Sequence, residues 1–496
     1  MCKHPDPLCC SQRRKPQHQQ ESEMSEQQHS QTLSTILDAM KKHHRQNEPA
    51  TAALRRDRLM RSAALIRDHH AALTEAIGRD FGHRSGYQTQ AADLITTINM
   101  LMHSAEKLEQ WMQPEAAEVP VPGMQAWIEP QPLGVVGIIS PWNFPINLAF
   151  GPLAGVFAAG NTAMLKPSEL TPFTSELLAE LVPHYFDSNE LVVVLGDAAV
   201  GQAFSQLPFD HLVFTGSTAV GRHVMRAAAE NLVPVTLELG GKSPVVLDTD
   251  AEISIAAERI LTIKTFNAGQ ICISPDYVLL PESSEAGFVD AAKRFMRASY
   301  PTLQHNVDYT AIINDRHYQR LIMLLDDAAR KGADIISLAP DNEPDVDPHS
   351  RKIAPHLILG VTQDMLVMQE EIFGPLLPLK TYAAGIGDAI RYINAGPRPL
   401  AAYYFGHDAE RQRQIATRTT SGALVINDVM THAAIDSLPF GGIGASGTGA
   451  YHGIHGFRRF SHAKPVVVQD SAAITNLRLR APYQDKAAVA EAFLNN

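Results

Sequence analysis

The cysteine best placed for chemistry is Cys272. Of the four cysteines, Cys2, Cys9 and Cys10 lie within the first ten residues, so Cys272 stands alone in the rest of the chain. It ends the segment Asn267–Cys272 (NAGQIC), between a predicted helix and a predicted strand, which places its thiol on a connection. A thiol in such a place is typical of a reactive nucleophile. The alternative is an inert small hydrophobic side chain, the more frequent state of a lone intracellular cysteine.

Two polar residues at the ends of predicted strands fit the same chemistry. Glu238 lies in the apolar run Val235–Leu239, just before two glycines. A carboxylate in an apolar cleft has a raised pKa, which suits a general base; a structural ion pair is the alternative. Asn143 lies in Ser140–Pro145 (SPWNFP). Its amide either donates to a developing oxyanion or caps the following helix.

Two further strand ends carry residues suited to a dinucleotide. Lys166 and Glu169 follow one strand, where an acid typically binds ribose hydroxyls. A favourable acid in a first helical turn is the alternative. Gly216 opens a turn into a helix that begins near Thr218, whose free N–H groups suit a pyrophosphate. The segment Phe214–Gly221 (FTGSTAVG) lacks the middle glycine of G-x-G-x-x-G, so an ordinary strand-to-helix turn remains an equal interpretation.

The elements that must position these residues form an α/β pattern. Short, continuously apolar runs separated by helices predict a parallel sheet buried on both faces. Ligands of such sheets bind at the carboxyl ends of the strands. The predicted strands are Leu133–Ile139, Thr162–Leu165, Leu191–Leu195, His211–Thr215 and Val235–Leu239. The predicted helices are Leu148–Ala159, Pro172–Tyr185 and Ala219–Glu230.

A second α/β section follows, from about residue 242 to residue 444. It has predicted strands at Pro244–Leu247 and Tyr277–Leu280, and predicted helices at Ala251–Phe266 and His317–Lys331. Residues 32–107 show a helical pattern, and residues 117–132 read as two extended pieces broken at Pro122-Gly123. A closing strand at Pro465–Val468 is expected to pair with that extended segment.

Composition excludes several classes of protein. The 496 residues are 45% hydrophobic and 19% charged with a net charge of −11, so a broad nucleic-acid footprint and docking to an anionic membrane are not expected. The longest apolar run, Leu148–Gly160, is shorter than the ~18 residues of a membrane span. The scarcity of cysteines indicates a reducing, cytoplasmic setting rather than a disulfide framework.

Residues 1–32 are polar and rich in glutamine, so we predict a disordered tail there. Both Met1 and Met24 are compatible with the start of translation. Cys2, His4, Cys9 and Cys10 have no second ligand pair at zinc-site spacing, and we predict no metal site.

Taken together, seven motifs resemble the NAD(P)-dependent aldehyde dehydrogenase superfamily. They are PWNFP, KPSE, FTGSTAVG, LELGGK, GQICIS, EEIFGP and PFGGIGASG, in the family's order and within residues 35–470. The ending GTGAYHGIHGFRRFSHAKPV resembles the class 3 branch, which includes fatty and aromatic aldehyde dehydrogenases. The resemblance implies a Rossmann-like parallel-sheet cofactor domain, an α/β catalytic domain and a small oligomerisation sheet.

On that resemblance the chain divides into parts with approximate boundaries. The cofactor domain comprises residues 33–116 and 132–240, and the catalytic domain comprises residues 241–444. Residues 117–131 and 445–475 form the bridging segments, and residues 476–496 form a C-terminal tail.

The resemblance also implies roles for individual residues. Cys272 matches the nucleophile, Glu238 the general base, and Asn143 the side-chain donor of the oxyanion hole. Cofactor contacts are implied for a larger set: Trp142, Lys166, Glu169, Gly216, Ser217, Gly221, Leu239, Glu371 and Phe373.

The implied activity is oxidation of an aldehyde to its carboxylic acid through a thiohemiacetal and a thioester on Cys272. NAD is the expected cofactor because Glu169 should repel a 2′-phosphate, and NADP remains an alternative. Overall likeness implies coniferyl aldehyde, oxidised to ferulate, as substrate, with medium- or long-chain aliphatic aldehydes as the alternative. A CoA-acylating enzyme and a catalytically silent structural protein are two further alternatives. Class 3 membership implies a homodimer.

Overall fold

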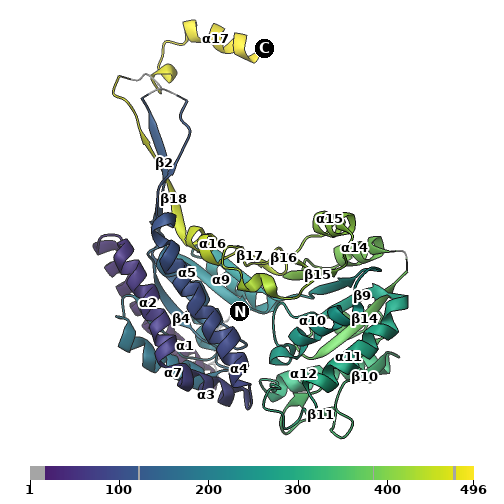
Figure 1. The fold of residues 1–496 in the computed structure, drawn as a ribbon. Helices are drawn as coiled ribbons and strands as arrows, with labels where there is room; N and C mark the ends of the chain where they lie inside the picture. The colour runs from purple at the N-terminus through teal and green to yellow at the C-terminus, as the bar shows by residue number, and fades with distance from the viewer. Residues whose placement is uncertain (1–16, 121–122, 384, 473–475, 496) are drawn as a thin grey trace, which may run out of the picture.

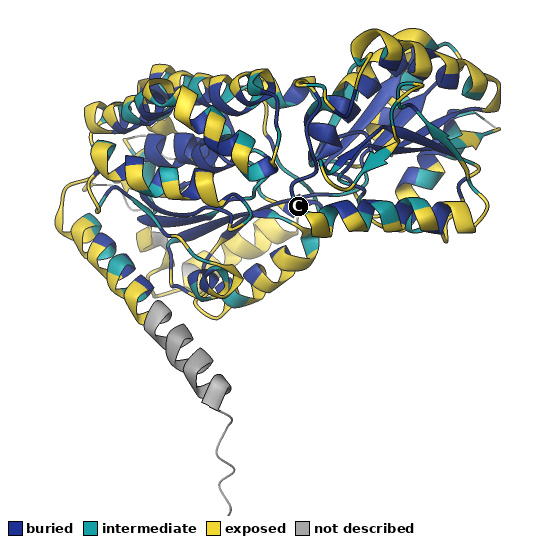
Figure 2. Cartoon of the chain, turned by 90° about the horizontal axis from the view of Figure 1, so that it is seen from below, coloured by how far each residue is buried: buried dark blue, intermediate teal, exposed yellow. Residues whose placement is uncertain are grey.

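The computed structural model describes residues 17–120, 123–383, 385–472 and 476–495. It contains two α/β lobes side by side and a thin antiparallel arm that projects from them (Figure 1). In both lobes the central strands of the sheet are buried, and most exposed residues lie on the outer faces of the covering helices (Figure 2). No helix among the described ranges is long and apolar enough to cross a membrane.

The cofactor lobe is built on a six-stranded sheet of order β17-β7-β6-β3-β4-β5. Its strands are β3 (Val135–Ile139), β4 (Thr162–Lys166), β5 (Leu191–Val193), β6 (His211–Gly216), β7 (Val235–Leu239) and β17 (Gly447–Thr448). The first five are parallel, and β17 is antiparallel to β7. The five parallel strands agree with the five expected from the sequence, because continuous apolar runs of this length are buried on both faces of a sheet.

Alternate residues of these strands enter two separate cores. Val136 and Ile138 pack under one helical layer, whereas Val135 packs under the other. The first layer contains α2 (Ala52–Asp68), α3 (His70–Phe81), α5 (Thr96–Trp111), α6 (Asn147–Ala158) and α7 (Pro172–Tyr185). The second contains α1 (Gln17–Gln46), α8 (Ala198–Ser205) and α9 (Thr218–Ala229). Between α3 and α5 the chain forms α4 (Gly86–Gln88) and a π-helical segment, Thr89–Ile95.

The catalytic lobe has a seven-stranded sheet of order β10-β13-β14-β9-β8-β15-β16, in which only β10 is antiparallel to its neighbour. The strands are β8 (Pro244–Leu247), β9 (Tyr277–Pro281), β10 (Asp334–Ser337), β13 (His356–Leu359), β14 (Leu376–Tyr382), β15 (Ala401–Phe405) and β16 (Ala423–Ile426). The helices are α10 (Ile253–Thr265), α11 (Glu285–Ser299), α12 (Asp315–Arg330), α13 (Leu366–Gln369), α14 (Ile386–Ala395) and α15 (Ala409–Arg418). A two-stranded ladder, β11 (Val346–Asp347) with β12 (Lys352–Ile353), lies outside the sheet.

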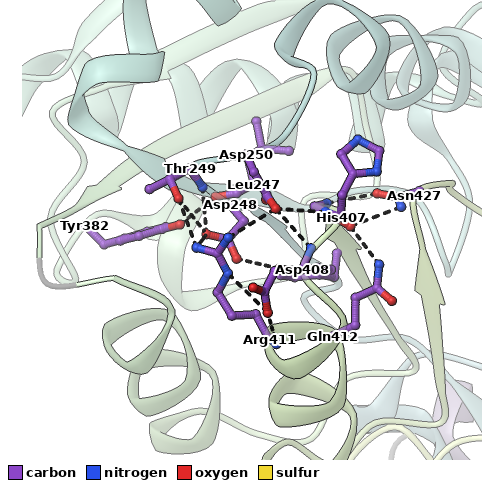
Figure 3. A network of polar contacts seen from close by, with 12 residues as sticks. Leu247, Asp248, Thr249, Asp250, Tyr382, His407, Asp408, Arg411, Gln412 and Asn427 are labelled. Carbon is purple, nitrogen blue, oxygen red and sulfur yellow. Dashed lines mark hydrogen bonds and ion pairs between the residues drawn. The ribbon is translucent and has the colours of Figure 1, made fainter.

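A polar network closes the end of this lobe at the carboxyl ends of β8 and β15 (Figure 3). Arg411, in α15, lies 3.1 Å from Asp248 and 3.1 Å from Asp250. The Tyr404 hydroxyl donates to the buried Asp248 carboxylate at 2.5 Å. The network joins α15 to the carboxyl ends of these two strands.

The arm confirms the pairing expected between the early extended segment and the closing strand. β18 (Ser461–Val468) runs antiparallel to β2 (Gln125–Pro132), with Pro465 opposite Ile128, and β1 (Glu115–Ala116) pairs with β2. We expected residues 476–496 to be a tail; of these, residues 476–495 are described and contain a short 3₁₀ turn and α17 (Gln484–Leu494) at the far end of the arm (Figure 1).

Two boundaries differ from the sequence prediction. β17 and α16 (Gly453–Arg459) were assigned to a bridging segment, but β17 joins the cofactor sheet and α16 packs against α6. The disordered tail predicted for residues 1–32 ends earlier in the structure, because α1 begins at Gln17. Residues 17–46 contain neither glycine nor proline, and the buried Leu33, Leu37 and Met40 anchor the helix, which then extends through good helix formers. Residues 1–16, with the cysteines considered for metal binding, lie outside the described residues.

Candidate active site

A cavity of about 710 Å³ opens at the carboxyl ends of β3, β6 and β7. Strand order leaves β3 with β4 on one side and β6 on the other, the kind of switch point where ligands bind in open α/β sheets. Nine of the twelve residues singled out from the sequence line this cavity: Trp142, Asn143, Gly216, Ser217, Glu238, Leu239, Cys272, Glu371 and Phe373. Gly221, Lys166 and Glu169 do not.

The loop before Cys272 has an uncommon backbone. Asn267, Ala268 and Gly269 have φ values of 49°, 50° and 72°, in the left-handed region that non-glycine residues rarely adopt. The Asn267 N–H donates to Gln88 Oε1 at 2.9 Å, and Gln270 Nε2 donates to the Asn267 carbonyl at 2.9 Å. Such strain persists where the surroundings hold it and is concentrated at functional sites.

The Cys272 thiol is free and half-buried. It lines both the large cavity and a second, mainly apolar cavity of about 310 Å³. Burial raises the pKa of Cys272 to about 12, with further contributions from the carboxylates of Glu371 and Glu238. The thiol is therefore protonated at neutral pH in the free protein.

Asn143 is held beside the Cys272 loop. Its Nδ2 donates to the Gln270 carbonyl at 3.2 Å, and its own carbonyl accepts from Arg84 Nη1 at 2.7 Å and Asn267 Nδ2 at 3.2 Å. The alternative of a helix cap is wrong, because α6 begins at Asn147.

The Asp93 side chain accepts the hydrogen bonds of the free N–H groups at the start of α6 instead. Its carboxylate accepts from the N–H of Ile146 at 3.0 Å and from the N–H of Asn147 at 2.5 Å. The Asn143 amide is consequently not needed for capping.

Glu238 is buried in β7, and neither carboxylate oxygen has a hydrogen-bond partner among the described residues. Burial raises its pKa well above the ordinary value, and Arg459 opposes this shift. Arg459 donates its hydrogen bonds elsewhere, to Thr236 Oγ1 at 2.9 Å and to the Val235 carbonyl. Glu238 therefore has no ion-pair partner among the described residues, which argues against the alternative of a structural ion pair.

The turn after β6 leads into α9. Ser217 caps the helix, its hydroxyl accepting from the Val220 N–H at 3.3 Å. A Cβ at Gly216 would lie 2.7 Å from the Phe214 ring, so glycine keeps the turn close to the sheet. A Cβ at Gly221 would lie 2.6 Å from Leu239 Cδ2, which explains why Gly221 packs helix against strand and does not reach the cavity.

Lys166 and Glu169 lie one strand further along, at the end of β4. The buried Lys166 ammonium donates to the Pro167 carbonyl at 3.1 Å and to Glu169 Oε2 at 3.4 Å. Burial lowers the pKa of Lys166. Their ribose contact stays a prediction.

Glu371 and Phe373 form the opposite wall. Burial, with the neighbouring Asp276, raises the pKa of Glu371 to about 8, and the Gly241 N–H donates to its carboxylate. A Cβ at Gly240 would lie 2.0 Å from Glu371 Oε2, so any larger residue there would displace the Glu371 carboxylate. The Phe373 ring meets Trp142 edge-on at 5.4 Å between centroids.

Several cavity residues were not singled out from the sequence, among them Arg222 in α9, and His317 and Arg320 in α12. The His317 ring lies 5.2 Å from that of Trp142. Spacing of three on a predicted helix places His317 and Arg320 on one face. That this face meets the cofactor lobe depends on how the two lobes pack.

The cavity fits a dinucleotide. The N-terminus of a twelve-residue helix, α9, suits a pyrophosphate, glycines 216 and 240 admit a close approach, and the wall beside Cys272 is aromatic. Residues 10–466 match the aldehyde dehydrogenase family.

The chain belongs to the aldehyde dehydrogenase family.

Two curated relatives agree with this assignment. The chain is 57% identical over 451 residues to a coniferyl aldehyde dehydrogenase of a Pseudomonas strain, covering 91% of this chain and 94% of the relative. It is 38% identical to aldehyde dehydrogenase family 3 member A2 of Pongo abelii, over 84% of each chain. The second likeness agrees with the class 3 resemblance.

Two solved structures agree as well. The substrate-bound state of Staphylococcus aureus AldH superposes with a TM-score of 0.87 at 36% identity, covering 93% of this chain and 99% of the other. Betaine aldehyde dehydrogenase of Staphylococcus aureus in complex with NAD+ superposes with a TM-score of 0.80 at 27% identity, covering 90% and 89%. The protein is thus an NAD(P)-dependent aldehyde dehydrogenase with the family fold.

Proposed function

We propose that the enzyme oxidises coniferyl aldehyde to ferulate, with Cys272 as nucleophile and Glu238 as general base. The observation that carries the roles is one cavity shared by Cys272, Glu238 and Asn143. NAD(P)+, bound in this cavity, supplies the acceptor for the hydride.

Cys272 loses its thiol proton to water in the cavity, and the thiolate sulfur attacks the aldehyde carbon, forming a C–S bond while the carbonyl π pair moves to the oxygen. The aldehyde oxygen becomes an oxyanion, which accepts from the Asn143 amide and the Cys272 N–H. Loss of the hydride leaves a thioester on Cys272. Glu238 then takes a proton from water, whose oxygen attacks the thioester carbon; the C–S bond breaks, Cys272 leaves as the thiolate, and the carboxylic acid is released.

The second cavity supports an aromatic substrate. Cys272 lines this cavity together with Phe144, Phe440 and Tyr451, and none of the glycines that line the large cavity borders it. Flat aromatic side chains favour a flat aromatic aldehyde over a flexible alkyl chain, since stacked or edge-on rings gain contact at little entropic cost. The Pseudomonas relative's name points the same way.

A steady-state comparison of coniferaldehyde, benzaldehyde and octanal, each with NAD and NADP, tests this proposal. The largest kcat/KM is expected for coniferaldehyde with NAD, and the product is free acid without added CoA. A preference for octanal would favour the aliphatic alternative, and product formed only with CoA would contradict the role of Glu238.

We also propose that the enzyme is a cytoplasmic homodimer. The near absence of cysteines outside residues 1–10, with Cys272 as a free thiol, is typical of a protein in a reducing compartment. In the arm, β18 is an edge strand with the exposed Val467 and Val468, and exposed edge strands readily pair with a second chain. Light scattering after gel filtration is expected to give twice the chain mass, and Val467→Lys is expected to shift the protein toward monomer.

A further inference from the structure

A largely buried ion pair joins the segment that follows Glu238 and β7 to the segment that follows Cys272. Lys242 follows Glu238 by four positions, and Asp276 follows Cys272 by four positions. Lys242 Nζ contacts Asp276 Oδ1, and the two side chains are 18% and 4% exposed. Neither residue has a part in the chemistry described above.

The remaining hydrogen bonds of this pair go to a third segment, residues 367–372. Lys242 Nζ donates to the carbonyl of Val367 at 2.7 Å and to the carbonyl of Glu370 at 2.8 Å. Asp276 Oδ2 accepts from the Ile372 N–H at 2.8 Å. The pair therefore binds the backbone on both sides of Glu371.

The conformation of this segment depends on those side chains. Residues 370–375 form no helix or strand, and Phe373 has a left-handed φ of 50°. Arg320 adds hydrogen bonds to the carbonyls of Glu371, at 3.2 Å, and of Ile372. No helix or strand hydrogen bonds hold Glu371 and Phe373 in the cavity. Their position therefore depends on this set of charged side chains.

We propose that Lys242 and Asp276 are positioning residues for the cofactor. They hold Glu371 and Phe373 against the nicotinamide end of the cofactor. They also fix the position of these two residues relative to Cys272. The inference rests on the proposed cofactor contacts of Glu371 and Phe373. Because desolvation of a buried carboxylate and a partly buried ammonium cancels much of their attraction, such a pair adds little stability, and its contribution here is the geometry it fixes.

The test uses Lys242→Met and Asp276→Asn, with Lys242→Arg as the variant that keeps the charge. A misplacement of about 1 Å can cost about 10²-fold in rate, so kcat/KM for NAD is expected to fall about 10- to 100-fold. Hydrolysis of 4-nitrophenyl acetate without cofactor needs Cys272 but not Glu371 or Phe373, and is expected to change less than about threefold. Lys242→Arg is expected to recover part of the loss.

Hydride transfer provides a second readout. With an aldehyde deuterated at the transferred hydrogen, the isotope effect on kcat is expected to rise in Lys242→Met and Asp276→Asn, because a displaced nicotinamide slows that step. Loss of stability alone would not raise it. The double variant is expected to be little worse than either single variant, as for residues that act as a unit.

Arg411→Met is the matched control. It removes a cation from the aspartate network at the far end of the same lobe (Figure 3), and is expected to lower the melting temperature without changing KM for NAD. Glu371→Gln tests the underlying proposal: if it leaves cofactor kinetics unchanged, the role of Glu371 fails. If Glu371→Gln weakens cofactor use while Asp276→Asn does not, or if ester hydrolysis and oxidation fall in parallel, the positioning role is overturned.

Discussion

The Asn143 amide donates to the Gln270 carbonyl at 3.2 Å, two residues before Cys272. An amide has two N–H donors, so this bond leaves one for a substrate oxygen. The same asparagine therefore supports the strained loop that presents the nucleophile and supplies a donor beside it. Its backbone is fixed in turn by Arg84 and Asn267.

Asn143→Ala removes that donor. Loss of one oxyanion donor typically costs ~10²–10³ in rate, and we expect kcat for coniferaldehyde to fall in that range. NAD binding, measured by calorimetry, should be little changed. Asn147→Ala, four residues on in α6, is a poor control because Asn147 lines the second cavity. Asn189→Ala is preferable, because Asn189 is half-buried and lines neither cavity. A fall of less than about threefold in Asn143→Ala would contradict the oxyanion role.

The raised pKa of Cys272 predicts slow alkylation of the free enzyme at neutral pH. The rate with iodoacetamide is expected to rise continuously from pH 7 to pH 10, because only the thiolate reacts and the pKa lies near 12. Glu371→Gln removes a nearby negative charge, so it should lower the thiol pKa and accelerate alkylation at pH 9. Cys272→Ala, which should bind NAD without turnover, gives the blank. A plateau below pH 8 in the parent enzyme would show that burial does not suppress the thiolate.

Glu238→Gln should separate the two halves of the reaction. We expect one equivalent of NADH per site in a rapid burst, followed by a stall at the thioester, as measured by stopped flow at 340 nm. Steady turnover without a burst would reverse the assignment.

The same carboxylate predicts a pH dependence of the parent enzyme. The base acts only when ionised, and burial raises the pKa of Glu238 well above its ordinary value. Thioester hydrolysis should therefore accelerate with rising pH and slow as pH falls through that raised pKa. Glu238→Gln is expected to lack this dependence.

Cofactor preference should depend on Glu169. Its carboxylate would repel the 2′-phosphate of NADP, while the neighbouring Lys166, at 3.4 Å, offsets part of that repulsion. Glu169→Gln is expected to raise kcat/KM for NADP relative to NAD several-fold, on the order of a one-charge change near a surface. An unchanged ratio would place the adenosine ribose elsewhere.

The strands could be predicted because continuous apolar runs have few alternatives to burial in a parallel sheet. β7 coincides with its predicted bounds, and β6 extends one residue beyond them. The start of α1 could not be predicted in the same way. Residues 17–32 are polar in composition, which predicted disorder. In the structure they extend α1 towards its N-terminus from the turns in which Leu33 and Leu37 pack against the sheet.

The active site likewise contains residues that the sequence identified and others that only tertiary packing brought there. Residue types at strand ends identified Cys272, Glu238 and Asn143, since the carboxyl edge of a parallel sheet brings together the residues at the end of each strand. Only tertiary packing decided that His317 and Arg320, on a helix of the other lobe, share the cavity, and that the Glu238 carboxylate has no described partner. Local spacing fixes which side chains share a face, but the environment that sets a pKa or closes a cavity comes from segments distant in the chain.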